Sequence, residues 1–143
     1  MQLLKPKVIL IEPAPPRRHV FSAARLPRLG MVSMATTLVR QGYEAGVWCQ
    51  QWAMPSLFEL LTADLVGIGM TTSTAPEGYR LARLLRRHGV PVVLGGPHVT
   101  FLPEEGLQHA DYVVRGEADR TFPALVGALL RNEGDPRAVP GTS

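Results

Sequence analysis

The sequence is poor in cysteine, and that shortage excludes several kinds of site. Cys49 is the only cysteine among the 143 residues. The chain can therefore form no internal disulfide, no cysteine-ligated iron–sulfur cluster and no multi-cysteine zinc site. Cys49 follows the apolar pair Val47-Trp48, and a small buried side chain is a simpler interpretation there than a nucleophile.

Charge and aromatic residues are also scarce. Charged residues make up 19% of the chain, the formal net charge is +3, and there are two Trp, three Tyr and four Phe. Nucleic-acid-binding proteins usually gather basic residues on one face and interleave them with aromatics. Here the basic residues are dispersed, apart from Arg17-Arg18 and Arg86-Arg87. We expect no nucleic-acid partner.

Long apolar segments are missing as well. The longest stretch without Asp, Glu, Lys or Arg is residues 88–103, and it contains three prolines and three glycines. Such a segment cannot form a membrane-spanning helix. The first residues also lack the apolar core and small-residue site of a signal peptide. We expect a soluble, cytoplasmic domain with no membrane partner.

Five short apolar runs alternate with segments of helical periodicity. Near-continuous aliphatic runs are typical of strands buried on both faces, as in a parallel sheet. Their alternation with helices predicts an α/β fold, a doubly wound five-stranded parallel sheet of order 2-1-3-4-5. The runs are Val8–Ile11, Ala45–Trp48, Leu65–Met70, Val92–Leu94 and Tyr112–Val114.

The helices are expected between the runs and after the last one. Apolar residues at helical spacing predict helices around residues 31–38, 81–88 and 122–129, with a shorter helix over 54–62 and a single turn over 104–109. The glycines that follow the three longer helices, Gly42, Gly89 and Gly134, suit helix ends. Thr74 and Glu77 have the spacing of a capping box, and Asp119 suits the N-cap of the last helix.

Ligands of such a sheet bind beyond the carboxyl ends of the strands. The loop after the first strand, residues 13–29, contains no glycine. A phosphate-binding loop needs glycines so that the backbone can approach the anion, which disfavours NAD and nucleoside triphosphates. The same loop holds His19, a lone loop histidine.

The other loops at this edge supply candidate binding residues. Hydroxyl groups follow the third strand, and they serve either a ligand or the local backbone. Tandem glycine follows the fourth strand, and it either admits a ligand or forms a tight turn. Arg115 and Glu117 after the fifth strand either brace a cofactor or form an ion pair. The candidate cofactor-binding residues are Thr71, Thr72, Ser73, Gly95, Gly96, Pro97, His98, Gly116 and Glu117.

Several of these segments, in this order, resemble the N-terminal cobalamin-binding domain of cobalamin-dependent radical S-adenosylmethionine enzymes. The resemblance is carried by the first strand and its proline-bearing loop, then by Leu26–Gly30, Leu65–Met70 with its hydroxyl run, Val92–Thr100 and Asp111–Glu117. It implies a Rossmann-like domain that holds cobalamin at its carboxyl edge. The nucleotide tail would insert beside the sheet and contact Thr71–Ser73 and the Gly95-Gly96 turn, with the first loop under the corrin.

Two departures from related patterns qualify this resemblance. Cobalamin domains of the methionine synthase type carry Asp-x-His-x-x-Gly in the first loop, whereas His19 is followed three residues later by Ser22. Cobalamin without histidine ligation is therefore expected, with no metal ligand from the chain. The radical domain needs three cysteines, which this chain lacks. Its iron–sulfur cluster and S-adenosylmethionine would belong to a partner domain.

The resulting prediction is a cobalamin-binding domain over residues 1–132 and a linker over 133–143 that leads to a C-terminal radical domain, as in an excised piece. No catalysis is expected from the chain alone; it would position the corrin for methyl transfer or radical modification by the radical S-adenosylmethionine enzyme to which it belongs. Two alternatives stay open. One is a docking domain that keeps the fold without a cofactor, and the other is a flavodoxin-like domain that binds another ligand such as a flavin.

Overall fold

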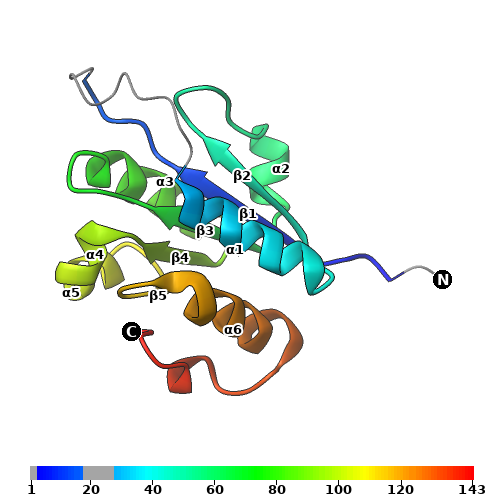
Figure 1. Cartoon of the computed structure of the whole chain (residues 1–143). Helices are drawn as coiled ribbons and strands as arrows, with labels where there is room; N and C mark the ends of the chain where they lie inside the picture. Colours follow the sequence, from blue (N-terminus) through cyan, green and yellow to red (C-terminus); the bar gives the residue numbers. More distant parts are fainter. Residues whose placement is uncertain (1–2, 18–27) are drawn as a thin grey trace.

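The computed structural model describes residues 3–17 and 28–143, which form an α/β domain (Figure 1). Each strand overlaps one of the apolar runs, and the helices lie between the strands and after the last one. The elements are β1 (Lys7–Glu12), α1 (Leu29–Arg40), β2 (Glu44–Cys49), α2 (Leu57–Leu61), β3 (Leu65–Gly69), α3 (Ala75–Arg87), β4 (Val92–Gly95), α4 (Pro97–Phe101), α5 (Pro103–Leu107), β5 (Tyr112–Val113) and α6 (Ala118–Arg131).

The strands form one sheet in the order β2-β1-β3-β4-β5. All four pairings between these strands are parallel. The predicted fold class and strand order are therefore confirmed. In the register of the sheet, Leu10 of β1 lies opposite Gly67 of β3, and Gly67 lies opposite Val93 of β4. Two residues further along the strands, Gly69 lies opposite Gly95.

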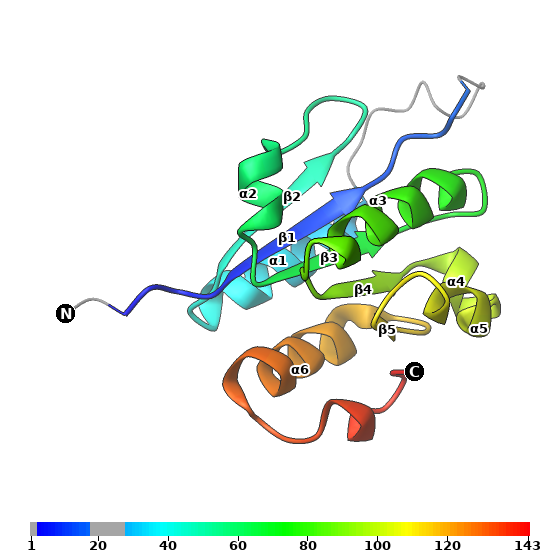
Figure 2. The ribbon, with the colours of Figure 1, turned by 180° about the vertical axis from the view of Figure 1, so that it is seen from behind.

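Helices cover both faces of the sheet. Helices α1 and α6 lie on the face that Figure 1 presents, and α2 and α3 lie on the face seen in Figure 2. Alternation along each strand divides the core accordingly. Leu10 and Val93 pack with α1 and α6, whereas Ile11 and Val92 belong to the cluster that includes α3.

The helix boundaries correct several expectations. Thr74 is the N-cap of α3, but its side chain accepts a hydrogen bond from the Thr71 N–H (3.0 Å) and makes no capping bond to the helix. The predicted capping box there is wrong, because Glu77 bonds Gln50 and Arg80 instead. A complete capping box occurs at α2, between Ser56 and Glu59.

The start of α6 and the segment after β4 also differ from expectation. Glu117 is the N-cap of α6 and Asp119 lies in the first turn, so the capping role predicted for Asp119 is wrong. Residues 97–101, expected as loop, form α4, which Pro97 opens at a first-turn position where its fixed φ suits a helix.

The predicted helix ends are mostly confirmed. Gly42 after α1 and Gly89 after α3 adopt φ of 91° and 77°. After α6 the left-handed residue is Asn132, with φ of 55°, and Gly134 follows two residues later with φ of 102°. Asparagine tolerates this conformation better than most side chains, because its short amide can bond the local backbone.

Residues 133–143, expected as a linker, return to the edge of the sheet. They include a short 3-10 helix, Pro136–Ala138. Val114 and Thr142 then form an antiparallel bridge, and the backbones of Val113 and Ser143 exchange two hydrogen bonds of 2.9 Å. These residues thus cover the free edge of β5. Within residues 3–17 and 28–143, no helix has the length and apolar content needed to cross a membrane.

Candidate functional site

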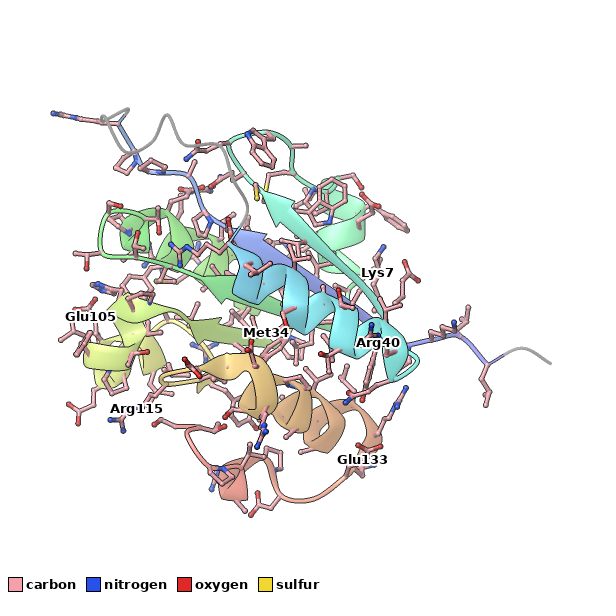
Figure 3. All side chains as sticks on the ribbon, viewed as in Figure 1. Lys7, Met34, Arg40, Glu105, Arg115 and Glu133 are labelled. Atoms are coloured by element: carbon pink, nitrogen blue, oxygen red, sulfur yellow. The ribbon has the colours of Figure 1, made fainter. Side chains whose placement is uncertain are left out.

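A cavity of about 330 Å³ opens at the carboxyl edge of the sheet, on the face covered by α1 and α6. Its floor is formed by β3 and β4, where Gly67, Gly69 and Gly95 present no side chains. Met34 of α1 forms part of one wall and lies on the side of α1 that faces α6 (Figure 3). Phe122 of α6 forms part of the opposite wall.

The floor follows from the strand pattern. The sequence Leu-Val-Gly-Ile-Gly of β3 alternates between the two faces, which directs Gly67 and Gly69 toward α1 and α6. A Cβ built on Gly69 would lie 3.1 Å from the Met31 Sδ atom. A Cβ on Gly67 would lie 2.7 Å from Leu10 Cδ2 and 3.0 Å from Phe122 Cζ. Met31, Leu10 and Phe122 therefore pack against the strand at the places that a side chain on Gly67 or Gly69 would occupy.

The two tandem glycines have different surroundings. Among the residues that the structure describes, a Cβ on Gly95 would meet only the Val114 carbonyl oxygen, at 3.8 Å, and Gly95 lines the cavity. Gly96 has φ of 98°, and a Cβ there would collide with the carbonyl oxygen and the nitrogen of Met70. Gly96 thus allows two segments of the backbone to approach each other, while Gly95 leaves space beside the sheet.

Charged residues lie at the mouth of the cavity. Arg28 immediately precedes α1, Glu117 immediately precedes α6, and Asp119 lies in its first turn. Glu12 at the end of β1 accepts a 2.8 Å hydrogen bond from the Arg28 backbone N–H and so fixes the entrance to α1. In the described part of the chain, no ion pair joins Arg115 to Glu117.

Thr100 connects the loops after β4 and β5. Its hydroxyl donates to the Gly96 carbonyl oxygen (2.9 Å) and accepts from the Gly116 N–H (3.0 Å). Both glycines line the cavity. One side chain in α4 therefore holds two parts of the rim together.

We expect Thr100→Val to lower the free energy of unfolding by about 1–2 kcal/mol, since the Gly116 N–H and the Gly96 carbonyl each lose a partner. Urea denaturation followed by circular dichroism measures the change. Thr36→Val is the matched control, because within the described part of the chain the Thr36 hydroxyl bonds only the Val32 carbonyl of its own helix. Equal effects of the two substitutions would contradict the role assigned to Thr100.

The structure brings together four of the nine candidate residues. Gly95, Gly96, Gly116 and Glu117 line the cavity. The remaining five do not, because the chain crosses to the other face of the sheet after Gly69 and after Gly96. These five are Thr71, Thr72, Ser73, Pro97 and His98.

The hydroxyl run takes part in a separate polar network. Thr71 and Ser73 bond each other at 3.1 Å between their hydroxyl oxygens. The Thr72 hydroxyl lies 3.2 Å from His98 Nδ1, and His98 Nε2 lies 2.9 Å from Glu105 Oε1.

Glu105 also accepts a 2.8 Å hydrogen bond from the Tyr79 hydroxyl. The hydrogen bonds from His98 and Tyr79 lower the pKa of Glu105. Burial raises the pKa of Tyr79, and the neighbouring carboxylate raises it further. The network ties the loop after β3 to α3, α4 and α5.

Cys49 lies at the same edge of the sheet, at the end of β2. Its Sγ lies 3.5 Å from Glu12 Oε2. Burial, together with the carboxylate of Glu12, raises the pKa of Cys49 to about 11. Cys49 is half-buried rather than buried as predicted. Its raised pKa disfavours the thiolate, which is the nucleophilic form.

The reaction of Cys49 with iodoacetamide at pH 8 should be at least about tenfold slower than that of an exposed cysteine, because a raised pKa keeps the thiol protonated. The rate should climb as the pH approaches 11. In Glu12→Gln the rate profile should shift to lower pH, since the negative charge is removed. Rapid alkylation at pH 8 in the unaltered chain would contradict this assignment.

The described residues do not gather three His, Cys, Asp or Glu side chains into a group that could hold a metal ion. His19 lies outside the described residues. Residues that the sequence interpretation missed include Met31, Met34 and Phe122, which it assigned only to helical apolar stripes. The signal that could have located the cavity is Gly67-x-Gly69 in a buried strand, aligned with Gly95.

Comparison with known proteins gives a family match and two curated relatives. A family model described as "B12 binding domain" matches residues 22–126. The chain is 44% identical over 69 residues to bacteriochlorophyllide d C-8(2)-methyltransferase of Chlorobaculum tepidum, which covers 48% of the chain and 15% of that protein. It is 46% identical over 73 residues to an uncharacterized methyltransferase of Pyrococcus horikoshii, which covers 48% of the chain and 16% of that protein.

The matched region is therefore a small part of each relative. Among solved structures, a beta-glucosidase from Listeria innocua in complex with gluconolactone aligns with a TM-score of 0.41 and 18% identity. That alignment covers 78% of the chain and 19% of the beta-glucosidase.

Proposed function

The chain belongs to the B12 binding domain family, and from that premise we propose that it binds cobalamin with the nucleotide tail in the cavity between β3, β4, α1 and α6. The observation that carries this proposal is the glycine floor. A tail inserted beside the sheet needs space where side chains would otherwise stand, and Gly95 leaves that space open.

The chemistry of the cavity fits such a tail. The thioethers of Met31 and Met34 and the ring of Phe122 offer apolar surface for a flat aromatic base. Methionine side chains are flexible and adapt to the shape of a ligand. At the mouth, Arg28 supplies a cation beside the path of a phosphodiester, and the acidic Glu117 and Asp119 can accept hydrogen bonds from ribose hydroxyls.

In this proposal the chain binds cobalamin and orients it, and the cofactor supplies the chemistry of the reaction. Bound cobalamin supplies cobalt-centred methyl transfer or radical chemistry. Gly95 and the methionine walls hold the tail, which fixes the corrin above the carboxyl edge of the sheet. Thr100 stabilises the rim by joining the Gly96 and Gly116 segments.

We further propose that a radical S-adenosylmethionine domain outside these 143 residues uses the positioned corrin for methyl transfer. Two observations support this. The motifs Gly95–His98 and Arg115–Glu117 resemble those of cobalamin-dependent enzymes of that class, and both curated relatives are methyltransferases. The iron–sulfur cluster and S-adenosylmethionine would be held by that domain, since this chain has a single cysteine.

Titration of the purified chain with hydroxocobalamin tests the proposal. We expect stoichiometric binding in equilibrium dialysis, red protein after gel filtration and an unfolding temperature that increases with cobalamin concentration. Protein that stays colourless with an unchanged unfolding temperature would contradict the proposal and favour a docking domain. Stabilisation by a flavin alone would favour a flavodoxin-like domain.

A further inference from the structure

We propose that the Thr72 hydroxyl binds a carboxamide side chain of the corrin, and that His98 and Glu105 hold this hydroxyl as a hydrogen-bond acceptor for the carboxamide N–H. The inference rests on the proposed function and deepens it by naming a contact outside the cavity. Thr72 is the residue that touches the cofactor, and His98 and Glu105 are positioning residues that act through it.

A largely buried network supports this exposed hydroxyl. Thr72 is exposed, whereas the His98 side chain is 10% exposed and Tyr79 is 8% exposed. The Thr72 hydroxyl lies 3.2 Å from His98 Nδ1, and His98 Nε2 lies 2.9 Å from Glu105 Oε1. The Tyr79 hydroxyl donates to the same carboxylate oxygen at 2.8 Å. Most surface hydroxyls rotate freely, but the bond to His98 fixes the orientation of this one.

The direction of each hydrogen bond follows from the carboxylate. Hydrogen bonds from His98 and Tyr79 lower the pKa of Glu105, so this group is ionised at neutral pH and can only accept. His98 therefore carries its hydrogen on Nε2, and in the neutral imidazole Nδ1 is an acceptor. Thr72 then donates its single hydroxyl hydrogen to Nδ1. Among residues 3–17 and 28–143 the Thr72 hydroxyl has no other partner, so its oxygen stays available to an external donor.

Thr72 lies close to the place where a tail in the cavity joins the corrin. Gly69 and Gly95 line the cavity at the ends of β3 and β4. Thr72 follows Gly69 by three residues, which places their Cα atoms at most about 11 Å apart. Glu105 lies at the same end of the sheet, where the strands terminate (Figure 3). A corrin above this edge extends over a comparable distance with its side chains, so its rim can reach Thr72.

The chemistry of the corrin rim matches a fixed acceptor. The rim carries carboxamide side chains, and each of them offers N–H donors. A carboxylate in the same place has no hydrogen to donate and would meet the lone pairs of the Thr72 oxygen. A hydroxyl that rotates freely could serve either group by turning its O–H. A preference for the carboxamide is therefore the signature of a hydroxyl held by His98.

Equilibrium dialysis at pH 8 against cyanocobalamin and its isomeric monocarboxylic acids, in which one peripheral propionamide is a carboxylate, tests the inference. We expect at least one isomer to bind at least about fivefold more weakly than cyanocobalamin. In Thr72→Val this ratio should fall by at least about threefold, and Thr72→Ser should retain it. Thr62→Val is the matched control, because in the described part of the chain the Thr62 hydroxyl bonds only carbonyl groups of its own helix.

A pair of neighbouring glutamates tests the positioning role. In Glu105→Gln the new amide can accept from Tyr79 and donate to His98 Nε2, which allows the tautomer with its hydrogen on Nδ1. The Thr72 hydroxyl can then donate to a ligand carboxylate, and the ratio should fall by at least about twofold. Glu104→Gln removes the same charge from the adjacent exposed position of α5 and should leave the ratio unchanged. Equal effects of the two substitutions would overturn the role of Glu105.

The ratio of two affinities measured on one variant does not depend on the fraction of folded protein. If Thr72→Val yields no folded protein, Thr72→Ala removes the same hydroxyl. Equal binding of all the isomers, or an unchanged ratio in the folded variant without the hydroxyl, would overturn the inference and leave the proposed function intact. A long-range ¹H–¹⁵N NMR spectrum at pH 8 that places a hydrogen on His98 Nδ1 would also overturn it. Failure of cyanocobalamin itself to bind would overturn both.

Discussion

We expect the Gly95→Val variant to bind cobalamin at least about 100-fold more weakly than the unaltered chain, a loss of about 2.7 kcal/mol in binding free energy. Gly95 is the floor position at which an added Cβ has its nearest neighbour, among residues 3–17 and 28–143, as far as 3.8 Å away. The branched methyl groups of valine would extend into the cavity and occupy the volume of the tail. Equilibrium dialysis measures the loss.

The fold should tolerate this substitution. The φ of Gly95 is not among the positive values of the chain, and valine suits a buried strand. Gly46→Val on β2 is the matched control, because an added Cβ there meets no described residue closer than Trp48 Nε1 at 3.9 Å and Gly46 does not line the cavity. Unchanged affinity in a folded Gly95→Val variant would contradict placement of the tail beside β4.

The second large effect is expected at the neighbouring glycine and concerns stability. Gly96→Ala should lower the free energy of unfolding by at least about 3 kcal/mol. Gly96 combines φ of 98° with ψ of 176°, a conformation essentially restricted to glycine. The added Cβ would also strike the backbone of Met70, which cannot rotate away as a side chain can.

Urea denaturation of Gly96→Ala beside Gly95→Ala measures the contrast between the two positions. Gly95→Ala should change the free energy of unfolding by less than about 1 kcal/mol, because its Cβ makes only ordinary contact. If the two alanine variants are equally stable, the close approach between Gly96 and Met70 is not a feature of the protein in solution.

The architecture could be predicted from the sequence because its signals are local and repeated. Each buried strand is a short aliphatic run, and 2-1-3-4-5 is a common strand order among doubly wound sheets of this kind. The predictions that failed concern side chains with several available partners. Glu77 has the spacing of a capping residue, but Gln50 and Arg80 bond it more directly in the folded chain.

Four of the nine candidate residues line the cavity and five lie elsewhere, and the reason is geometric. Sequence spacing indicates that residues follow neighbouring strands, but it does not say toward which face the chain turns after a strand ends. Thr72 and His98 turn toward α3 and bond each other, whereas Gly95 and Gly116 stay on the side of α1 and α6. The spacing of Gly67 and Gly69 does indicate which face they share, because residues two apart within a strand lie on the same face of the sheet.

The central claim is that cobalamin inserts its tail between the sheet and helices α1 and α6. The NMR resonances of the methionine methyl groups test this claim most directly. Met31 and Met34 line the cavity, whereas Met54 and Met70 pack in the core on the other face of the sheet. With methyl-¹³C-methionine protein, saturating hydroxocobalamin should shift the Met31 and Met34 methyl signals through the ring current of the base and move those of Met54 and Met70 far less. Bound cobalamin that leaves Met31 and Met34 unshifted, or that shifts Met70 instead, would contradict the account.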